Sequence, residues 1–462
     1  MKAVSSNDVA RILIVGGGYV GMYTALRLQR KLKQELRQGS VRITVVDPDP
    51  YMTYQPFLPE AAAGSLSPRH VVVPLRRVLP QCQVVIGEVT ALDHDARTAT
   101  VETLAAEAAG AADTEIAYDE LILAPGSVSR TLPVPGLADH GIGFKTVEEA
   151  IGLRNHVLEQ LDIASSTRDP AVRDAALTFV FVGGGYAGVE ALAELEDMAR
   201  YAVRYYHNVE ATDLKWILVE ATGKILPEVG PEMGRYAVRE LRARNIDVRL
   251  DTRLDSCEDR IAVLSDGSRF PTRTLVWTAG VKPPPILAAT GLPLNGRGRL
   301  KCTAALQVDG VAHAWAAGDA ATIPDLTAPE PATPDEPPAL CAPNAQHALR
   351  QARTLAENVA AAVRGGPLLD YRHKYTGSVA SLGLHKGVAH VYGRKLRGYP
   401  AWFMHRAYHL SRIPTFNRKA RVLAEWTLSG LFKREIVSLG SLENPRAEFE
   451  LAAGTGRHNE AS

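Results

Sequence analysis

The chain reads ILIVGGGYVG at residues 12–21, and a close copy, FVFVGGGYAG, stands at residues 179–188. In both fingerprints a short apolar strand leads into glycines spaced as G-x-G-x-x-G, and a helical pattern follows. One such pattern is a weak signal, but two in the same strand-and-helix context are a strong one. They predict that one polypeptide binds two dinucleotides, which indicates an electron-transfer enzyme rather than a simple dehydrogenase.

Each glycine of a fingerprint has a separate role. The first permits a tight turn, the third lets the backbone approach a pyrophosphate, and the last lets the helix pack on the strand. These positions are Gly16, Gly18 and Gly21 in the first fingerprint and Gly183, Gly185 and Gly188 in the second. The backbone N–H groups and the helix dipole then hold the phosphate charge. The alternative is a glycine-rich turn that binds no ligand.

Composition is typical of a soluble globular protein with two or three domains. The 462 residues are 46% hydrophobic and 22% charged, and the net charge of +1 does not favour nucleic acid as a partner. The cysteines, Cys82, Cys257, Cys302 and Cys341, form no C-x-x-C. This spacing argues against a disulphide framework, a zinc site and a redox-active pair. The 13 histidines show no H-E-x-x-H, so we expect no metal and place most histidines at the surface or in packing.

The chain is expected to lie in the cytoplasm. A strand begins close to the start of the sequence, and no basic region followed by an apolar segment indicates a signal peptide. The most apolar stretch, residues 175–195, contains four glycines and two glutamates, which interrupt it too often for a membrane-spanning helix. Contact with a membrane is therefore expected from the surface only.

The organisation predicts an α/β fold with two Rossmann-like dinucleotide-binding domains and a C-terminal region. The second unit repeats the first: a fingerprint, a helix, a strand that ends in an acid, and a strand that runs into a glycine turn. The expected strands cover 11–15, 41–46, 84–86, 98–101, 121–123, 214–219 and 274–280, and the clearest helices cover 22–36 and 344–364. The expected units are 8–150, 170–285, 290–370, 371–446 and a disordered tail, 447–462. Residues 103–114 and the proline-rich residues 324–343 are expected to be exposed excursions.

An acid at the end of the strand after each fingerprint should bind ribose hydroxyls. These acids are Asp47 and Glu220. A carboxylate at Glu220 accepts from a 2′-hydroxyl and repels a 2′-phosphate, so the second site should prefer NADH to NADPH. Lys224 and Arg273 are candidate phosphate ligands that weaken this preference. The alternative is a solvated acid at the end of a strand.

The first fingerprint, the turn Ala124-Pro125-Gly126 and the late Ala317-Gly318-Asp319 resemble the disulphide-reductase-like flavoproteins that use FAD and a nicotinamide nucleotide. The counterpart of this turn in the second unit ends at Gly280, which we expect to contact the second nucleotide. The resemblance implies that the first site binds FAD, that Gly318 and Asp319 return to complete it, and that the inserted second module binds NADH. The cofactors carry the hydride chemistry, so no further catalytic cluster is required.

The electron acceptor separates the candidate functions. A disulphide reductase or a sulphide:quinone oxidoreductase needs cysteines facing the flavin, and the cysteine spacing does not provide a pair. The remaining acceptors are a quinone, dioxygen, a ferredoxin-like protein or another small oxidant.

Several segments, spread over nearly the whole chain, resemble the type II NADH:quinone oxidoreductases. YQPFLPE at 54–60 resembles that family's F/Y-Q-P-L-L-P-E, GVE at 188–190 matches, and NAQHALRQ at 344–351 resembles its A-Q-x-A-x-Q helix. The resemblance implies that Glu190 lies near the flavin and assists proton or hydride handling. It also implies a quinone site at Gln346, with Arg350 in place of the second glutamine. The residues that it further assigns to FAD are Tyr19, Val20, Gln55, Pro56 and Val89.

At positions i and i+4, Gln346 and Arg350 would share one helix face that points at the flavin. An arginine there could stabilise a developing quinol anion. The alternative for Arg350 is an exposed helix charge, and the alternative for Glu190 is an acid favoured by the helix dipole.

The C-terminal segment 394–435 is basic and aromatic. It carries ten Lys or Arg against two Glu, a net charge of +8, among Trp, Phe, Tyr and Leu. This composition suits an anionic membrane surface. The alternative is a folded cap that packs on the body or forms a homodimer interface; nucleic acid is not expected, because no binding motif accompanies the charge.

Taken together, these patterns predict a peripheral flavoenzyme on the inner face of the cell membrane. NADH would reduce FAD, and the electrons would pass to a menaquinone- or ubiquinone-like acceptor without proton pumping. One alternative is a soluble NAD(P)H-dependent flavoenzyme that reduces a protein or a specialised small molecule. Another is a redox-sensing flavoprotein whose partners change with its reduction.

Overall fold

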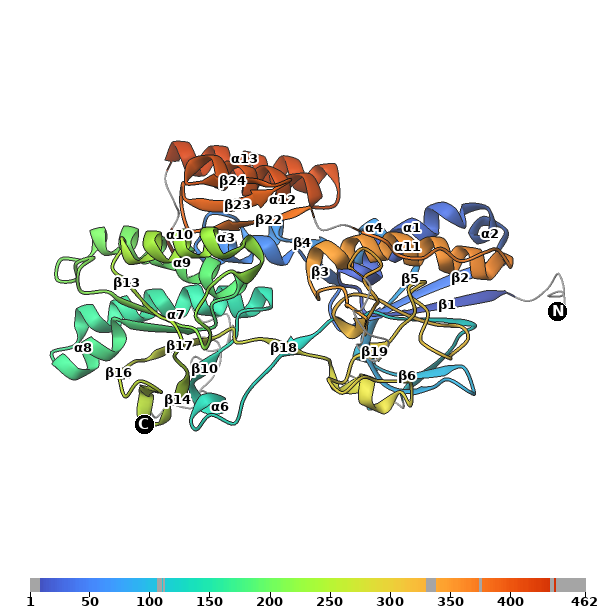
Figure 1. Ribbon diagram of the computed structural model, residues 1–462, viewed down its shortest axis with the longest axis horizontal. Helices are drawn as coiled ribbons and strands as arrows, with labels where there is room; N and C mark the ends of the chain where they lie inside the picture. The colour runs from blue at the N-terminus through green and yellow to red at the C-terminus, as the bar shows by residue number, and fades with distance from the viewer. Residues whose placement is uncertain are drawn as a thin grey trace, which may run out of the picture.

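A seven-stranded sheet forms the centre of the first domain (Figure 1). The computed structural model describes residues 9–105, 110, 113–329, 338–373, 376–432 and 436–437. The strands are β20 (Ala314–Ala316), β8 (Glu120–Leu123), β1 (Ala10–Val15), β2 (Val41–Asp47), β5 (Gln83–Asp93), β6 (Thr98–Thr103) and β7 (Thr114–Ala117), in that order across the sheet. From β20 to β5 neighbouring strands are parallel, and β6 and β7 are antiparallel additions. Because β20 comes from the returning chain, residues near 318 lie beside the first fingerprint.

The second domain is built on a five-stranded parallel sheet. Its order is β10 (Gly141–Ile142), β17 (Thr274–Trp277), β11 (Thr178–Val182), β12 (Lys215–Val219) and β13 (Ile246–Arg249). A small antiparallel sheet adjoins it, made of β14 (Leu254–Ser256), β15 (Ile261–Leu264) and β16 (Arg269–Pro271). The antiparallel pair β9 (Val128–Ser129) and β18 (Val281–Lys282) carries the chain between the two domains (Figure 1). The predicted strands are confirmed, with shifts of a few residues at their ends.

The helices cover the two sheets. They are α1 (Tyr19–Lys31), α2 (Lys33–Gln38), α3 (Leu58–Ala62), α4 (Leu75–Val78), α6 (Leu137–His140), α7 (Val147–Ser166), α8 (Pro170–Ala176), α9 (Tyr186–Ala202), α10 (Pro231–Arg242) and α11 (Ala345–Arg364). Two further short strand pairs lie outside the main sheets. They are β3 (Tyr51–Thr53) with β4 (Val72–Pro74), and β19 (Leu300–Lys301) with β21 (Ala321–Thr322). The helix predicted over 344–364 is confirmed as α11. The single helix predicted over 22–36 is wrong, because Leu32 leaves helical geometry and divides it into α1 and α2.

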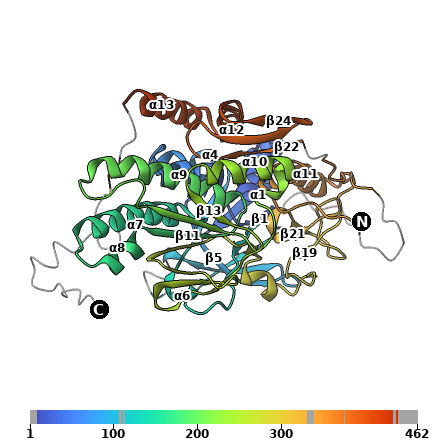
Figure 2. The same ribbon diagram turned by 60° about the vertical axis from the view of Figure 1, so that its left-hand side comes forward.

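Residues 377–432 form a third layer on top of the second domain (Figures 1 and 2). The layer consists of the antiparallel strands β22 (Gly377–Ser381), β23 (Gly387–Val391) and β24 (Arg394–Arg397), followed by α12 (Tyr399–Arg412) and α13 (Phe416–Phe432). The sequence did not predict this small sheet. Arg244 fixes the layer to the second domain, since its guanidinium donates to the Leu382 carbonyl at 2.6 Å and to the Ala193 carbonyl at 2.9 Å, and pairs with Glu196.

Parts of three predicted segments lie outside the described residues: positions within 103–114, positions 330–337 of the proline-rich stretch, and the tail 447–462. Among the helices that the structure describes, none is long and apolar enough to cross a membrane.

Candidate functional site

The first fingerprint lies where the carboxyl ends of β1, β2, β8 and β20 meet, since parallel strands all end at one edge of a sheet. Gly16 has φ +101°, and a Cβ there would stand 2.3 Å from the Ala124 carbonyl oxygen. A Cβ on Gly21 would stand 1.7 Å from the Gly16 oxygen. Side chains at these two glycines are therefore excluded by the protein itself.

Gly18 differs from its neighbours because no described atom lies within 4 Å of the position of its Cβ, and the same is true of Gly126. These bare backbone surfaces flank the start of α1 and fit a pyrophosphate that would itself fill the space. Asp47 lies beside them, and its carboxylate accepts from Gly17 N at 2.5 Å and from Asp49 N at 2.8 Å. Burial raises the pKa of Asp47 to about 6.

The returning segment places Gly318 and Asp319 at the same edge. Gly318 N donates to Oε1 of Gln351 at 2.8 Å, and a Cβ on Gly318 would stand 2.7 Å from the Val20 side chain. The Ser127 hydroxyl donates to the Asp319 carboxylate at 2.8 Å.

Lys145 Nζ in turn donates to the Ser127 hydroxyl at 2.9 Å. Burial lowers the pKa of Lys145, against the opposing charge of Asp319. The sequence analysis did not identify Ser127, Lys145 or Gln351 as site residues. Two of them could have been found from their place in the sequence, since Ser127 directly follows the predicted glycine turn and Gln351 lies one position after Arg350.

The remaining residues assigned to FAD are spread more widely. Tyr19 begins α1, and its buried hydroxyl has no hydrogen-bond partner among the described residues. Gln55 is exposed in a short 3₁₀ helix, Pro56 is half-buried beside it, and Val89 is buried on β5. Their cofactor contacts stay predictions.

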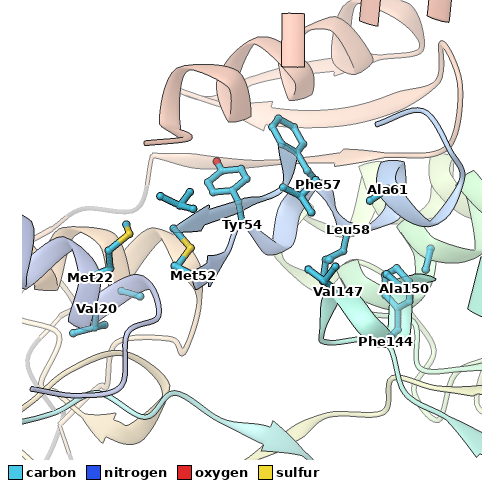
Figure 3. Packing of buried hydrophobic residues seen from close by; sticks show 14 of the residues in the cluster. Val20, Met22, Met52, Tyr54, Phe57, Leu58, Ala61, Phe144, Val147 and Ala150 are labelled. Atoms are coloured by element: carbon cyan, nitrogen blue, oxygen red, sulfur yellow. The ribbon is translucent and has the colours of Figure 1, made fainter. Parts of the chain in front are cut away.

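Tyr54 and Phe57, on either side of the 3₁₀ turn, project toward the C-terminal layer (Figure 3). Figure 3 also shows Leu58 packed on the start of α7, against Val147. The segment that resembles the family motif therefore joins both domains to the C-terminal layer.

The second fingerprint repeats the first arrangement at the ends of β11, β12 and β17. Gly183 has φ +118° and packs on Thr278, whereas no described atom lies within 4 Å of a Cβ on Gly185 or on Gly280. Gly188 has no room for a side chain, because a Cβ there would stand 2.1 Å from the Gly183 oxygen.

Glu220 occupies the place that Asp47 has in the first site. Its carboxylate accepts from Gly184 N at 2.7 Å and from Thr222 N at 2.8 Å. Arg273 is wrong as a phosphate ligand, because it precedes β17 at the amino end of the sheet, where its Nε donates to Gln160 at 3.0 Å. Lys224 is exposed in the loop after β12.

Glu190 lies in α9, 6% exposed, directly under the C-terminal layer. Its Oε1 accepts from Ser381 N at 2.8 Å and lies 3.1 Å from Nε2 of His405. His405 belongs to α12 and is 2% exposed. The sequence analysis missed this histidine, although the H-x-x-x-H spacing of His405 and His409 on one helix is a signal that could have identified it.

Gln346 and Arg350 do lie one turn apart on α11, but the amide of Gln346 is already bonded within the protein. It donates to the Gly377 oxygen at 2.9 Å and faces His373 Nε2 at 3.1 Å. Nη1 of Arg350 donates to the main-chain oxygen of Gln346 at 3.0 Å. The α11 side chain that reaches the first fingerprint's edge is Gln351, through Gly318. These contacts therefore do not support the prediction that Gln346 and Arg350 together face the flavin.

Helices α12 and α13 carry six Phe and Leu side chains that are each between 52% and 85% exposed, besides Tyr399 at 57%. We call the surface of these six side chains the docking face; it consists of Phe403, Phe416, Leu423, Leu428, Leu431 and Phe432. Arg412 and Arg421 are exposed on the same helices.

Part of the predicted basic surface is paired with acids of the body. Lys395 and Arg397 form exposed ion pairs with Glu232 of α10. Arg406 pairs with Glu60 at 3.0 Å, and Trp426 Nε1 donates to the same carboxylate at 2.6 Å. The region is thus both a cap fixed to the body and a surface with an apolar outer face. Residues 433–435 lie outside the described part.

The four cysteines are free thiols. Burial raises the pKa of Cys82 and of Cys302 to about 12, and that of Cys341 to about 11. These thiols therefore stay protonated near neutral pH and do not provide a reactive thiolate.

The sequence profile described as "Pyridine nucleotide-disulphide oxidoreductase" matches residues 10–352. The type II NADH:quinone oxidoreductase of Staphylococcus epidermidis is 27% identical over 406 residues, covering 86% of this chain and 94% of the relative. The protein of the same name from Staphylococcus aureus is 28% identical over 404 residues, with the same coverage.

Two solved structures share the fold. NDH2 from Plasmodium falciparum in complex with RYL-552 has a TM-score of 0.82 at 16% identity, covering 93% of this chain and all of that one (100%). The sulphide:quinone oxidoreductase of Aquifex aeolicus has a TM-score of 0.67 at 17% identity, covering 92% and 96%.

Proposed function

Because this chain belongs to the pyridine nucleotide-disulphide oxidoreductase family, we propose that it passes electrons from NADH through FAD to a quinone, without pumping protons. The single observation that carries the choice of quinone is the C-terminal layer. Its inner side meets Glu190 of the second domain, while its outer side is the apolar docking face. An apolar acceptor dissolves in lipid. A layer with one side on Glu190 and the other side apolar is suited to bring such an acceptor from a lipid surface to the second domain.

FAD and NADH are the two cofactors of this enzyme. We assign FAD to the first site because the returning segment completes it, with the Asp319 carboxylate fixed by Ser127 and the bare backbone of Gly18 at the start of α1. NADH then occupies the second site, at Gly185 and Glu220. FAD, when bound, supplies the ring that accepts the hydride.

The protein's own residues bind, orient and handle protons. Asp47 and Glu220 hold the ends of the two strands against the glycine turns and are placed to accept from ribose hydroxyls. Glu190 is placed to exchange a proton with the acceptor, because its carboxylate is nearly buried and faces a histidine at 3.1 Å. The free, protonated cysteines do not support disulphide chemistry.

The docking face supports peripheral attachment to the inner face of the cell membrane. Exposed Phe and Leu side chains can enter the apolar boundary of a bilayer, while Arg412 and Arg421 meet anionic headgroups.

Steady-state NADH oxidation by the FAD-loaded protein tests the proposal. A water-soluble ubiquinone or menaquinone analogue should raise the rate well above the rate with dioxygen alone, to more than about one turnover per second. An NADH oxidation rate that does not respond to either quinone would refute quinone reduction. NADPH should be a poorer donor because Glu220 repels its 2′-phosphate.

A further inference from the structure

Two histidines of α12 point into the protein, on the side opposite the docking face. His405 and His409 are four residues apart, so they lie on one side of the helix, and their ring centroids are 4.5 Å apart. Both ring nitrogens of His405 are buried and make no hydrogen bond of good geometry among the described residues, although Nε2 lies within ion-pair distance of Glu190, at 3.1 Å from its Oε1. A buried nitrogen without a partner needs an explanation, because such atoms are costly in folded proteins.

His409 continues the contact toward the first domain. Its Nδ1 lies 3.1 Å from the Tyr54 hydroxyl, and this hydroxyl lies 3.2 Å from the main-chain oxygen of His409. The hydroxyl carries one proton and has two acceptors within reach, so its proton can turn from one to the other without displacing heavy atoms. Figure 3 shows Tyr54 projecting toward the layer that carries α12. His409 is only partly buried, whereas Tyr54 and His405 are each 2% exposed.

The surrounding charges keep the two rings in different states. Burial alone lowers the pKa of His405, but the carboxylates of Glu190 and Glu60 raise it above its ordinary value, against the charge of Arg406. Burial and the neighbouring His405 hold the pKa of His409 well below its ordinary value. His405 therefore holds a proton more readily than His409, so a proton that reaches His409 can pass on to His405.

We propose that His405 and His409 form a proton relay, with the Tyr54 hydroxyl positioning the His409 ring, that resupplies Glu190 during turnover. The relay rests on the quinone reduction proposed above. NADH delivers two electrons and one proton as a hydride, and a quinone takes up two electrons and two protons, so each turnover draws one proton from water. Nε2 of His405 gives a proton to the Glu190 carboxylate, which passes it to the quinone oxygen. His409, which is partly exposed, then restores the proton of His405 from solvent.

The test compares two acceptors in the FAD-loaded enzyme. Quinone reduction consumes protons, whereas ferricyanide takes electrons only. H405Q should lower kcat with a water-soluble quinone by at least about tenfold, within the range of proton-transfer catalysis, and leave kcat with ferricyanide unchanged. Wild-type kcat with quinone should decline on the alkaline side as His405 loses its proton. H405K, which keeps a protonated group at this position, should recover activity and move that decline to higher pH.

Three comparisons make the result decisive. H409Q should show the same difference between acceptors as H405Q, whereas H207Q, a change at an exposed histidine of the second domain, should show none. FAD content and the unfolding midpoint identify any variant that fails to fold. If H405Q fails to fold, H409Q still tests the relay, because His409 is less buried. Equal losses with quinone and ferricyanide would make the histidines structural and overturn the relay, while leaving quinone reduction intact. A wild-type enzyme that reduces ferricyanide but no quinone would instead overturn the proposed function.

Discussion

Gly18 and Gly21 stand three residues apart in one fingerprint, yet a methyl group should have different consequences at each. A Cβ on Gly21 would lie 1.7 Å from the Gly16 oxygen, whereas no described atom lies within 4 Å of a Cβ on Gly18, which has an extended backbone with φ −71°. We therefore expect that the protein needs Gly21 in order to fold, and we propose that it needs Gly18 for a ligand.

We expect G18A to leave the unfolding free energy of the flavin-free protein within about 0.5 kcal/mol of the wild type, while its FAD content falls sharply. G21A should cost about 3 kcal/mol or more, because a backbone oxygen cannot move aside. Urea unfolding and the flavin absorbance of the purified proteins measure both effects. Normal FAD binding by G18A would contradict the prediction that the pyrophosphate lies against Gly18.

Asp47 makes FAD affinity depend on pH. In the flavin-free protein burial raises the pKa of Asp47 to about 6. Ribose hydroxyls that donate to the carboxylate favour its charged form and lower that pKa on binding, so binding releases a proton. FAD should therefore bind more tightly as the pH rises to about 6, with little further change above it. Fluorescence titrations from about pH 5 to 8 would show this slope in the wild type and its loss in D47N. The same pH dependence in both proteins would show that Asp47 does not bind the ribose.

At the scale of elements, the C-terminal layer is held by Arg244, which donates to the Leu382 carbonyl while forming a buried ion pair within the second domain. Arg244, from the end of α10, and Glu196 of α9 are both nearly buried, and Arg244 also reaches Asp197 at 3.1 Å. Removing Arg244 leaves the buried Glu196 with one remaining ion-pair partner, Arg200, whose side chain is 43% exposed. The cost of this is far larger than that of losing an exposed pair.

R244M should therefore lower the free energy of unfolding by about 3 kcal/mol, the lower end of the cost of breaking a buried pair, because Arg200 still pairs with Glu196. The double variant E196M/R244M should be more stable than R244M, because the buried carboxylate is removed and the charge left behind, on Arg200, is 43% exposed. K215M, which breaks the exposed pair between Lys215 and Asp174, serves as the control and should cost less than about 1 kcal/mol. Chemical unfolding curves compare the variants. If R244M and K215M lose the same stability, Arg244 does not hold the layer.

For the whole molecule, the docking face predicts binding to vesicles that contain anionic lipid. Burying a Phe side chain contributes about 1.5–3 kcal/mol, and Phe416 and Phe432 are 85% and 76% exposed. F416S/F432S should lower the vesicle partition coefficient at least about tenfold, even if each ring is only partly buried in lipid. Vesicle sedimentation measures it, and added salt should weaken the contribution of the arginines.

Y205S is the matched control, since Tyr205 is 69% exposed on the second domain, away from the docking face, and the change should leave partitioning unaltered. Analytical ultracentrifugation of the same variants tests the alternative occupant. If F416S/F432S binds vesicles normally and instead converts a dimer to a monomer, the docking face is a homodimer interface.

The parts of this protein that depend on local chemistry could be predicted from its residues alone. Glycines with steric roles, apolar strands, strand-end acids and the helix after Asn344 can be read locally because backbone sterics and periodicity act over a few residues. Composition singled out the basic-aromatic C-terminus, whereas Glu190 was singled out only by the family resemblance. Local patterns could not anticipate that Leu32 divides a helix or that residues 377–397 pair as a sheet.

Only the tertiary structure decided which side chains meet. His405 faces Glu190 across 215 positions of chain, Gln351 rather than Gln346 reaches Gly318, and Arg273 points away from the nucleotide edge. These outcomes depend on how α12, α11 and β17 dock, and docking is set by burial and long-range pairing summed over whole elements. A local pattern can show that a residue suits a site, but the packing of distant elements determines whether it lies in one.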